Sequence, residues 1–338
     1  MPRKVLVLGG TDFVGPAVVG ASLARGDEVT IFHRGRTGSA PDGVRVIHGD
    51  RTNPDDLSVL TDERWDIVVD AWSRAPQVVQ SAARALEPHA RRYVYISTIS
   101  VYADAHEGVI SEASPTVEGR PDAETTDYAA DKRGAELAIE EVFGGDRCLF
   151  ARPGLILGPR ENIGRLPWWL RRVAKGGDVL APGPRDLAVQ YIDARDLAAF
   201  AIDTALHGPV NVLSRPGHTT MAEVLALCNE VTGSAASFTW VDAEFLLAHE
   251  VAPWTELPIW VPPVGDTASF YSCDSSLALR SGLTCRSARD TAQDTWSWLT
   301  DHPEWTQVVT ANRSRVGMEP EREAALLAAW AGQPPAAR

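Results

Sequence analysis

The sequence has few of the residues that mark secreted, metal-binding or membrane proteins. Its four cysteines (Cys148, Cys228, Cys273 and Cys285) form no Cys-x-x-Cys pair and accompany no histidine cluster, so we expect neither disulfides nor a bound metal. No apolar run approaches the ~20 residues that span a bilayer. The N-terminus has neither a long apolar segment nor a small-residue cleavage site. These absences predict a cytoplasmic protein with no membrane partner.

Positive charge is also scarce. The 338 residues include 32 Lys and Arg against 45 Asp and Glu, which gives a net charge of −13. Because binding to nucleic acids and to anionic membranes depends on positive charge, we expect no nucleic-acid partner. The hydrophobic fraction of 44% and the charged fraction of 23% are ordinary for a globular protein with a sizeable core.

Short apolar segments alternate with helical patterns over the first 160 residues. Helical patterns such as Phe13–Arg25 and Val78–Leu86 lie between them. The alternation predicts βαβ units and an α/β fold with a Rossmann-type doubly wound parallel sheet, covered on both faces. The apolar segments, rich in β-branched and aromatic residues, are Val5–Leu8, Val29–Phe32, Val44–His48, Ile67–Ala71, Tyr93–Ser97 and Cys148–Arg152.

The rest of the chain is less regular and predicts a smaller, discontinuous α/β domain packed on the first. Thr220 and Glu223 form a capping box that opens a helix, and Gly233 closes it. We expect the first domain to cover 1–160, with 187–215 and about 265–275 returning to it. The second domain and the C-terminal helices then take 161–186, 216–264 and 276–332.

A glycine-rich turn joins the first strand to the first helix: Gly9-Gly10-Thr11-Asp12-Phe13-Val14-Gly15. Glycines in such a turn let the backbone approach a pyrophosphate, and the helix N-terminus offers free N–H groups and a partial positive charge. A turn placed between a strand and a helix, in a unit of about 30 residues, favours a dinucleotide site over a plain strand-to-helix turn. We therefore expect 1–160 to be an NAD(P)-binding Rossmann domain.

The end of the second strand indicates which dinucleotide is bound. His33, Arg34 and Arg36 stand where NAD-binding proteins carry a carboxylate. Arginine suits a ribose 2′-phosphate because it is planar, bidentate and always charged. The sequence thus favours NADP(H), with NAD(H) as the alternative if both arginines are simply solvated. Gly49 and Asp50 end the third strand, where a carboxylate could accept a hydrogen bond from the adenine amino group.

Tyr128 and Lys132 are four residues apart at the start of a helical stretch and share one helix face. An ammonium beside a phenol lowers the phenol pKa, normally ~10, so the tyrosine can exchange a proton near neutral pH. Taken alone, this spacing is common on protein surfaces. Thr98 and Ser100 follow the fifth strand, and the C-terminal ends of parallel strands line the ligand crevice.

The glycine turn, the strand-end hydroxyl and Tyr-x-x-x-Lys, in that order, resemble the extended short-chain dehydrogenase/reductase superfamily, the NAD(P)-dependent epimerase/dehydratase group. Arg152-Pro153 through Gly158-Pro159 and the run Tyr191–Leu197 extend the resemblance over most of the chain. It implies hydride transfer at the nicotinamide and a homodimer. Thr98 then matches the catalytic hydroxyl, Tyr128 the acid/base, and Lys132 the lysine that holds the nicotinamide ribose. Further cofactor contacts are expected at Ala71, Trp72, Pro153 and Leu155.

Three features depart from the family pattern. Asp12 replaces the middle glycine, so its carboxylate must turn away from a pyrophosphate or cap the helix. Ile99 and Ser100 follow Thr98, where dehydratases carry acidic residues, and Leu155 stands where many nucleotide-sugar enzymes place asparagine. These departures favour a reductase or dehydrogenase acting on a small carbonyl, alcohol or imine. The alternatives are a nucleotide-sugar epimerase with retained cofactor and a dinucleotide-binding regulatory or RNA-associated protein.

Four residues are candidates for substrate contact. Arg74, after the fourth strand, would meet an anionic group, and Ser100 would meet a substrate oxygen. Trp168 and Trp169 would line an apolar or aromatic pocket. Core packing for the tryptophans and a solvated loop position for Arg74 are the plainer interpretations.

Overall fold

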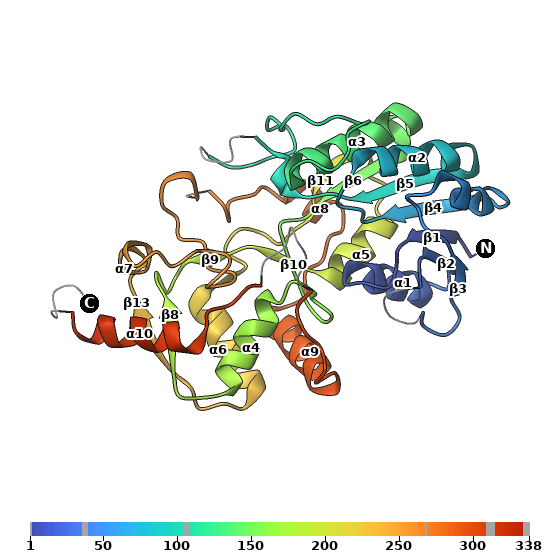
Figure 1. The fold of residues 1–338 in the computed structure, drawn as a ribbon. Coiled ribbons are helices and arrows are strands. Elements are labelled where there is room, and N and C mark those ends of the chain that lie inside the picture. Colours follow the sequence, from blue (N-terminus) through green and yellow to red (C-terminus); the bar gives the residue numbers. More distant parts are fainter. Residues whose placement is uncertain (1, 36–39, 104–107, 268, 309–314, 334–338) are drawn as a thin grey trace.

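The computed structural model describes residues 2–35, 40–103, 108–267, 269–308 and 315–333. Within these ranges the chain forms a seven-stranded sheet with helices on both faces and a smaller lobe beside it (Figure 1). The predicted α/β, Rossmann-type fold is confirmed. Arg36 lies outside the described residues.

Every strand of the large sheet runs parallel to its neighbours, in the order β11-β6-β5-β4-β1-β2-β3. The strand order reverses between β1 and β4, and ligands of open α/β sheets bind at the carboxyl ends of the strands at such a switch point. The strands are β1 (Lys4–Leu8), β2 (Glu28–His33), β3 (Arg45–His48), β4 (Trp65–Asp70), β5 (Ala90–Ile96), β6 (Cys148–Arg152) and β11 (Gly208–Asn211).

Helices cover both faces of the sheet because alternate strand residues point to opposite sides. In β1, Val5 and Val7 belong to one hydrophobic cluster, with α1 (Val14–Ala24) and α5 (Ala194–Asp203). Leu6 and Leu8 belong to another, with α2 (Pro76–Leu86) and α3 (Tyr128–Phe143). Figure 1 shows these two helix pairs on opposite faces of the sheet.

The smaller lobe has its own hydrophobic cluster and pairs its short strands in separate two-stranded sheets. The predicted capping box of Thr220 and Glu223 opens α6, and Gly233 ends it in the left-handed conformation. The lobe's helices are α4 (Arg165–Ala174), α6 (Met221–Thr232), α7 (Ala243–Ala248), α9 (Ala288–Asp301) and α10 (Pro320–Ala331). Its strands are β8 (Asp178–Pro182) with β13 (Ser237–Val241), and β9 (Ala188–Val189) with β12 (Thr219–Thr220). The parallel pair β7 (Leu155–Leu157) and β10 (Tyr191–Asp193) joins the lobe to the sheet.

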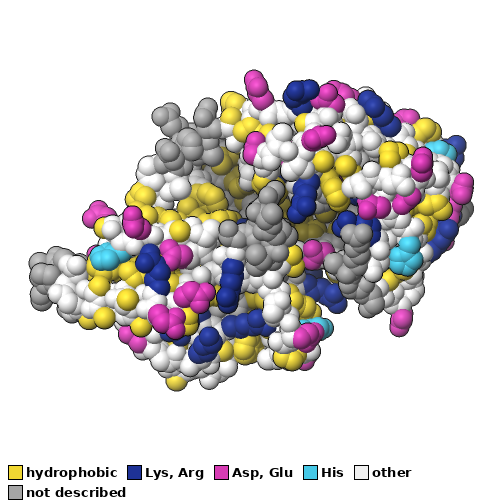
Figure 2. All heavy atoms as spheres, viewed as in Figure 1, with side chains coloured by type: hydrophobic (Ala, Val, Ile, Leu, Met, Phe, Trp, Pro, Cys, Tyr) yellow, Lys and Arg dark blue, Asp and Glu magenta, His cyan; other side chains and the backbone are white. Residues whose placement is uncertain are grey.

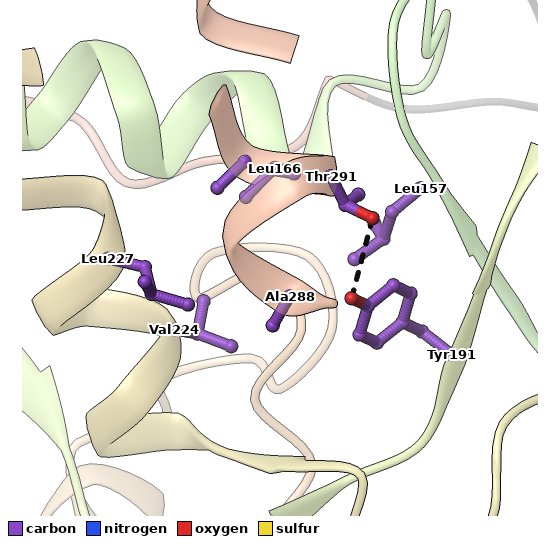
Figure 3. Close-up of a pocket in the computed structure, with 8 residues that line it drawn as sticks. Leu157, Leu166, Tyr191, Val224, Leu227, Ala288 and Thr291 are labelled. Carbon is purple, nitrogen blue, oxygen red and sulfur yellow. Dashed lines mark hydrogen bonds between the residues drawn. The ribbon is translucent and has the colours of Figure 1, made fainter. Parts of the chain in front are cut away.

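A small cavity of about 20 Å³ lies among α4, α6 and α9 (Figure 3). Leu157, Leu166 and Val224 line it, and the hydroxyls of Tyr191 and Thr291 meet across it at 3.5 Å. Pockets for drug-sized ligands are at least ten times larger, so this cavity is a packing gap and not a substrate site.

The chain returns to the large sheet after the first domain. Hydrophobic residues from 192 to 213 and from 273 to 283 pack on the α1–α5 face. Leu187 and Val189 pack in the smaller lobe. The second return continues through α8 (Ser276–Arg280).

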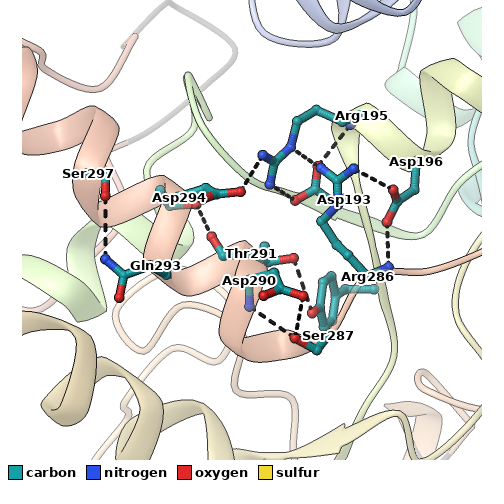
Figure 4. A network of polar contacts seen from close by, with 12 residues as sticks. Asp193, Arg195, Asp196, Arg286, Ser287, Asp290, Thr291, Gln293, Asp294 and Ser297 are labelled. Atoms are coloured by element: carbon teal, nitrogen blue, oxygen red, sulfur yellow. Dashed lines mark hydrogen bonds and ion pairs between the residues drawn. The ribbon is translucent and has the colours of Figure 1, made fainter.

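Charged side chains fasten the lobe to α5 (Figure 4). Arg286 contacts both Asp193 and Asp196, and Arg195 joins Asp193 to Asp294 on α9. The Asp193 carboxylate is fully buried and also caps α5 by accepting from the Arg195 N–H. The network therefore fixes α9 relative to the large sheet.

Within the described ranges, no helix is both long and apolar enough to cross a membrane. Each of the four cysteines is a free thiol.

A second buried charge cluster supports the strand that leads to Thr98. The Glu136 carboxylate on α3 accepts two hydrogen bonds from Arg152 at 2.8 and 2.6 Å and one from the Ser97 hydroxyl at 2.7 Å. The Arg152 side chain is 3% exposed and that of Glu136 is fully buried. Arg152 thus depends on Glu136 for its solvation, and the Glu136 carboxylate is also paired with Arg133 at 3.0 Å.

Replacing Glu136 should destabilise the protein strongly, because Arg152 would be left as an unpaired buried charge. For Glu136→Ala we expect the free energy of unfolding to fall by about 3–5 kcal/mol in urea titrations. The control is Glu230→Ala, which removes the exposed pair between Glu230 on α6 and Arg289 on α9 and should change stability far less, because exposed ion pairs contribute little. Equal losses in the two variants would contradict this assignment.

Candidate active site

The glycine-rich turn is shaped by two close backbone approaches. A Cβ on Gly15 would lie 2.7 Å from the Gly10 Cα, and one on Gly10 would lie 2.8 Å from Ile31. Gly9 and Gly10 have φ of +112° and +90°, which favour glycine. A Cβ on Gly9 would meet nothing within 4 Å among the described residues, so the turn is open on that side. These are the features that a bound pyrophosphate requires.

The start of α1 is left available to an anion. Phe13 is the N-cap residue, its φ is +37°, and no side chain caps this end of α1 among the described residues. Asp12 points its carboxylate away, accepting a hydrogen bond from the Asn162 amide at 2.7 Å. The first turn of α1, all of which is described, contains no acidic residue. Free N–H groups and the helix dipole therefore favour a phosphate here.

The expected adenosine end lies beside His33, Arg34 and Asp50. The half-exposed Arg34 guanidinium is 4.0 Å from the Asp50 carboxylate. Asp50 also accepts from the N–H and hydroxyl of Thr52. Burial, with His48 nearby, lowers the pKa of His33. A Cβ on Gly49 would lie 2.5 Å from the Phe32 ring, so only glycine fits there.

Sequence reasoning missed a buried ion pair beside this end. Arg51 donates to both Asp70 carboxylate oxygens, at 2.6 and 2.7 Å, and Tyr93 donates to one of them at 2.7 Å. The same carboxylate accepts the Trp72 N–H. An aspartate ending the apolar strand β4 was the available signal, because such a charge needs a partner.

Lys132 points inward from α3 to the ends of two strands. Its ammonium donates to the carbonyl of Trp72, after β4, at 2.8 Å and to that of Ile96, which ends β5, at 2.6 Å. The Tyr95 ring lies 4.6 Å from the ammonium, and the Tyr95 hydroxyl donates to the same Trp72 carbonyl at 2.6 Å. Burial lowers the pKa of Lys132 to about 7.

Tyr128 is the first residue of α3, and its side chain is 51% exposed. Two aspartates fix this helix start. Asp127 caps it by accepting from the Ala130 N–H, and the buried Asp131 accepts from the N–H and hydroxyl of Thr126. The helix thus carries a buried ammonium and an accessible phenol one turn apart.

Thr98 and Ser100 form a short hydroxyl pair directly after β5. The buried Thr98 hydroxyl accepts from the Ser100 N–H and donates to the exposed Ser100 hydroxyl, both at 3.1 Å. The two contacts with Ser100 therefore fix the buried Thr98 hydroxyl, and the Ser100 hydroxyl is the exposed one of the pair.

The other predicted site residues are more scattered. Arg74 and Ala71 are exposed on the loop after β4, Trp72 is half-buried there, and Pro153 is buried after β6. The indole nitrogen of Trp72 is buried without a partner among the described residues.

Leu155 and Trp169 both lie in the hydrophobic core of the smaller lobe. Leu155 is 4% exposed. Trp169 is fully buried, and its indole donates to the Pro258 carbonyl at 2.5 Å. Trp168 is partly buried against that core, at Gly317.

The surface is hollowed between the large sheet and the smaller lobe, with hydrophobic and basic side chains around the hollow (Figure 2). The glycine turn, Lys132 and Thr98 all lie at the carboxyl edge of the large sheet. The open turn, the uncapped helix and the inward lysine fit a dinucleotide.

Comparison with known proteins identifies the family. A model of the NAD dependent epimerase/dehydratase family matches residues 5–214. The chloroplast stem-loop binding protein of 41 kDa b from Arabidopsis thaliana is 26% identical over 213 residues, covering 58% of this chain. The match spans about half of that relative's length, 53%.

Solved structures share the fold. The enzyme WbmH of Bordetella bronchiseptica, in complex with NAD⁺, has a TM-score of 0.67 at 17% identity and covers 89% of this chain and 99% of its own. The UDP-glucose 4-epimerase of Thermotoga maritima, with UDP-glucose, has a TM-score of 0.65 at 15% identity, covering 88% and 99%. At these identities the likeness concerns the fold alone.

Replacing the buried lysine should change how stability depends on pH. The pKa of Lys132 is about 7 in the folded protein and about 10.5 in the unfolded chain. Between these values the unfolded chain binds the extra proton, so wild-type stability should rise by about 1.4 kcal/mol per pH unit from this group. The free energy of unfolding of Lys132→Met minus that of the wild type should therefore be highest below pH 7 and fall toward pH 9.5.

Urea titrations across this range check the expectation, with the exposed Lys175→Met as control. The control difference should stay flat. A flat difference for Lys132→Met as well would show that folding does not lower the pKa of Lys132.

Proposed function

Because the chain belongs to the NAD dependent epimerase/dehydratase family, we propose that it is an NADP(H)-dependent oxidoreductase. It transfers hydride to or from a small carbonyl, alcohol or imine compound. The observation that carries the proposal is the pairing on α3 of a buried Lys132 ammonium with an accessible Tyr128 phenol, at the sheet edge that holds the glycine turn.

The site residues divide the binding and proton-transfer roles among them in this proposal. The turn Gly9–Gly15 binds the pyrophosphate, and Lys132 holds the nicotinamide ribose. The bound dinucleotide supplies the hydride donor or acceptor. In the reductive direction Tyr128 gives its hydroxyl proton to the substrate oxygen or nitrogen as the carbon is reduced. Thr98 and Ser100 orient that atom through hydrogen bonds.

Arg34 supports the choice of NADP(H). Its guanidinium lies at the end of β2, close to the Asp50 carboxylate, and is half-exposed. A ribose 2′-phosphate would offer this guanidinium a bidentate, doubly charged partner. The solved structures crystallised with NAD leave NAD(H) as the alternative cofactor.

A nucleotide-sugar epimerase is the second candidate. Several solved structures of this fold are UDP-glucose 4-epimerases. Against it, the buried Leu155 side chain occupies the position where a diphosphate-binding asparagine would stand.

An RNA-associated role is the third candidate and rests on the name of the Arabidopsis relative. The net charge of −13 opposes it, because nucleic-acid affinity comes largely from neutralised phosphates. We propose that the partner of this chain is a small molecule and not a nucleic acid.

Removing the Tyr128 hydroxyl should abolish turnover and spare dinucleotide binding. We expect Tyr128→Phe to lower NADPH consumption on a panel of aldehydes, ketones and imines by about 10²–10⁴-fold, because the proton donor is lost. Fluorescence titration with NADPH should give the wild-type dissociation constant. Tyr191→Phe, which changes a phenol inside the smaller lobe, is the control and should keep full activity.

Full turnover by Tyr128→Phe would refute the assignment. Wild-type protein that retains nicotinamide absorbance through purification and interconverts UDP-sugars without net NADPH consumption would establish the epimerase instead. A defined RNA footprint with steep salt dependence would establish the third candidate.

Replacing Arg34 should discriminate between the two dinucleotides. Arg34→Ala should raise the dissociation constant for NADPH by about 10–100-fold through the loss of a charge-assisted contact, and leave that for NADH within about twofold. The control is Arg91→Ala, which removes an exposed arginine at the amino end of β5. Equal effects on both dinucleotides would count against 2′-phosphate recognition.

A further inference from the structure

Lys132 is enclosed by groups from several elements. The main-chain carbonyls of Trp72 and Ile96 accept two of its three N–H donors. Charges also face it, with Asp70 from β4 and Glu136 from its own helix favouring the ammonium, and Arg51 opposing it. The ring of Tyr95 on β5 also lies against the ammonium, with its centroid 4.6 Å from the nitrogen.

Tyr95 reaches three parts of the site at once. Its ring contacts the Lys132 ammonium, its hydroxyl donates to the Trp72 carbonyl that also accepts from Lys132, and it interacts electrostatically with Tyr128. The side chain is fully buried, and burial raises the pKa of Tyr95 well above its usual range. Tyr95 therefore stays protonated and out of contact with solvent, which suits a supporting part and not proton transfer.

We propose that Tyr95 is a positioning residue for the Tyr128–Lys132 pair, holding the Lys132 ammonium on its ring beside the Trp72 carbonyl. The functional consequence rests on the proposed function, in which charged Lys132 lowers the pKa of Tyr128 and binds the ribose. The negative face of an aromatic ring favours the charged form of an amine, and it does so more strongly where water is excluded.

The sign of the effect follows from that attraction. The ring stabilises the ammonium, so it raises the pKa of Lys132 against the opposing effect of burial. Without the ring's negative face, less of the lysine would be charged at pH 7. Any activity that needs the ammonium would then end at a lower pH.

The test measures the charge of Lys132 directly by NMR. The sequence contains only three lysines, Lys4, Lys132 and Lys175, so protein labelled with ¹³C at the lysine ε-carbon gives few signals, and Lys132→Met assigns the one of interest. At position 95, phenylalanine, difluorophenylalanine and pentafluorophenylalanine form a series of nearly constant shape. Fluorine withdraws electrons and removes the ring's negative face without opening a cavity to water.

We expect the Lys132 titration midpoint to stay near that of the wild type in Tyr95→Phe. It should fall stepwise through the fluorinated series, by about one pH unit in total. The same series at Tyr93, a fully buried phenol on the same strand, is the control. Because the Tyr93 hydroxyl donates to Asp70, Tyr93→Phe is the reference of that series, and fluorination beyond it should leave the midpoint in place. If the pentafluoro protein does not fold, the difluoro protein still tests the direction.

A midpoint that does not move along the Tyr95 series, or that moves equally along the Tyr93 series, would overturn the proposal. The measurement uses the full chain without substrate or dinucleotide. A failure of the proposed function, seen as full turnover by Tyr128→Phe, would therefore leave this result standing, and the two failures are distinguishable.

Discussion

A buried ammonium sets the architecture of this sheet edge. An amine can keep its charge away from water only where acceptors are already aimed at it, and Lys132 meets two carbonyls at the ends of β4 and β5. Trp72 follows the end of β4 and Ile96 is the last residue of β5, so both carbonyls lie at the carboxyl edge of the sheet. The parallel sheet thus provides, through its backbone, the site that the lysine occupies.

The same edge explains why so much charge is buried nearby. Asp70 ends β4 and is paired with Arg51, and its carboxylate also accepts the Trp72 N–H. Trp72 is thereby held at its N–H by the ion pair, while its carbonyl accepts from Tyr95 and Lys132. On the other side of Lys132, Glu136 and Arg152 fix the strand end that carries Thr98. Two buried ion pairs therefore flank the lysine, and each fixes a strand terminus on which its position depends.

The sequence predicted the parts of this site that depend on local pattern. The glycine turn, the strand ends and the Tyr128–Lys132 spacing are read from neighbouring residues, and the structure has the turn, the strands and the helix where they were expected. The partners Arg51 with Asp70 and Asp12 with Asn162 are 19 and 150 residues apart, so no periodicity could reveal them. For Trp169 the local pattern is ambiguous. An aromatic residue on an amphipathic helix has the same sequence pattern whether it faces a pocket or the core. Its burial under Pro258 is decided by the path of a distant, irregular segment.

The contact between Asp12 and Asn162 bears on whether the dinucleotide is exchanged or retained. The segment that carries Asn162 is well fixed, since the buried Glu161 accepts the N–H groups of Arg165 and Leu166 at the start of α4. The bridge itself is a single exposed hydrogen bond at 2.7 Å. Such a bond contributes about 1 kcal/mol, which changes the ratio of closed to open turn by only about fivefold. Under the proposed function, a bridge of that strength would slow dinucleotide release only slightly, which fits an enzyme that exchanges its cofactor at each turnover better than one that retains it.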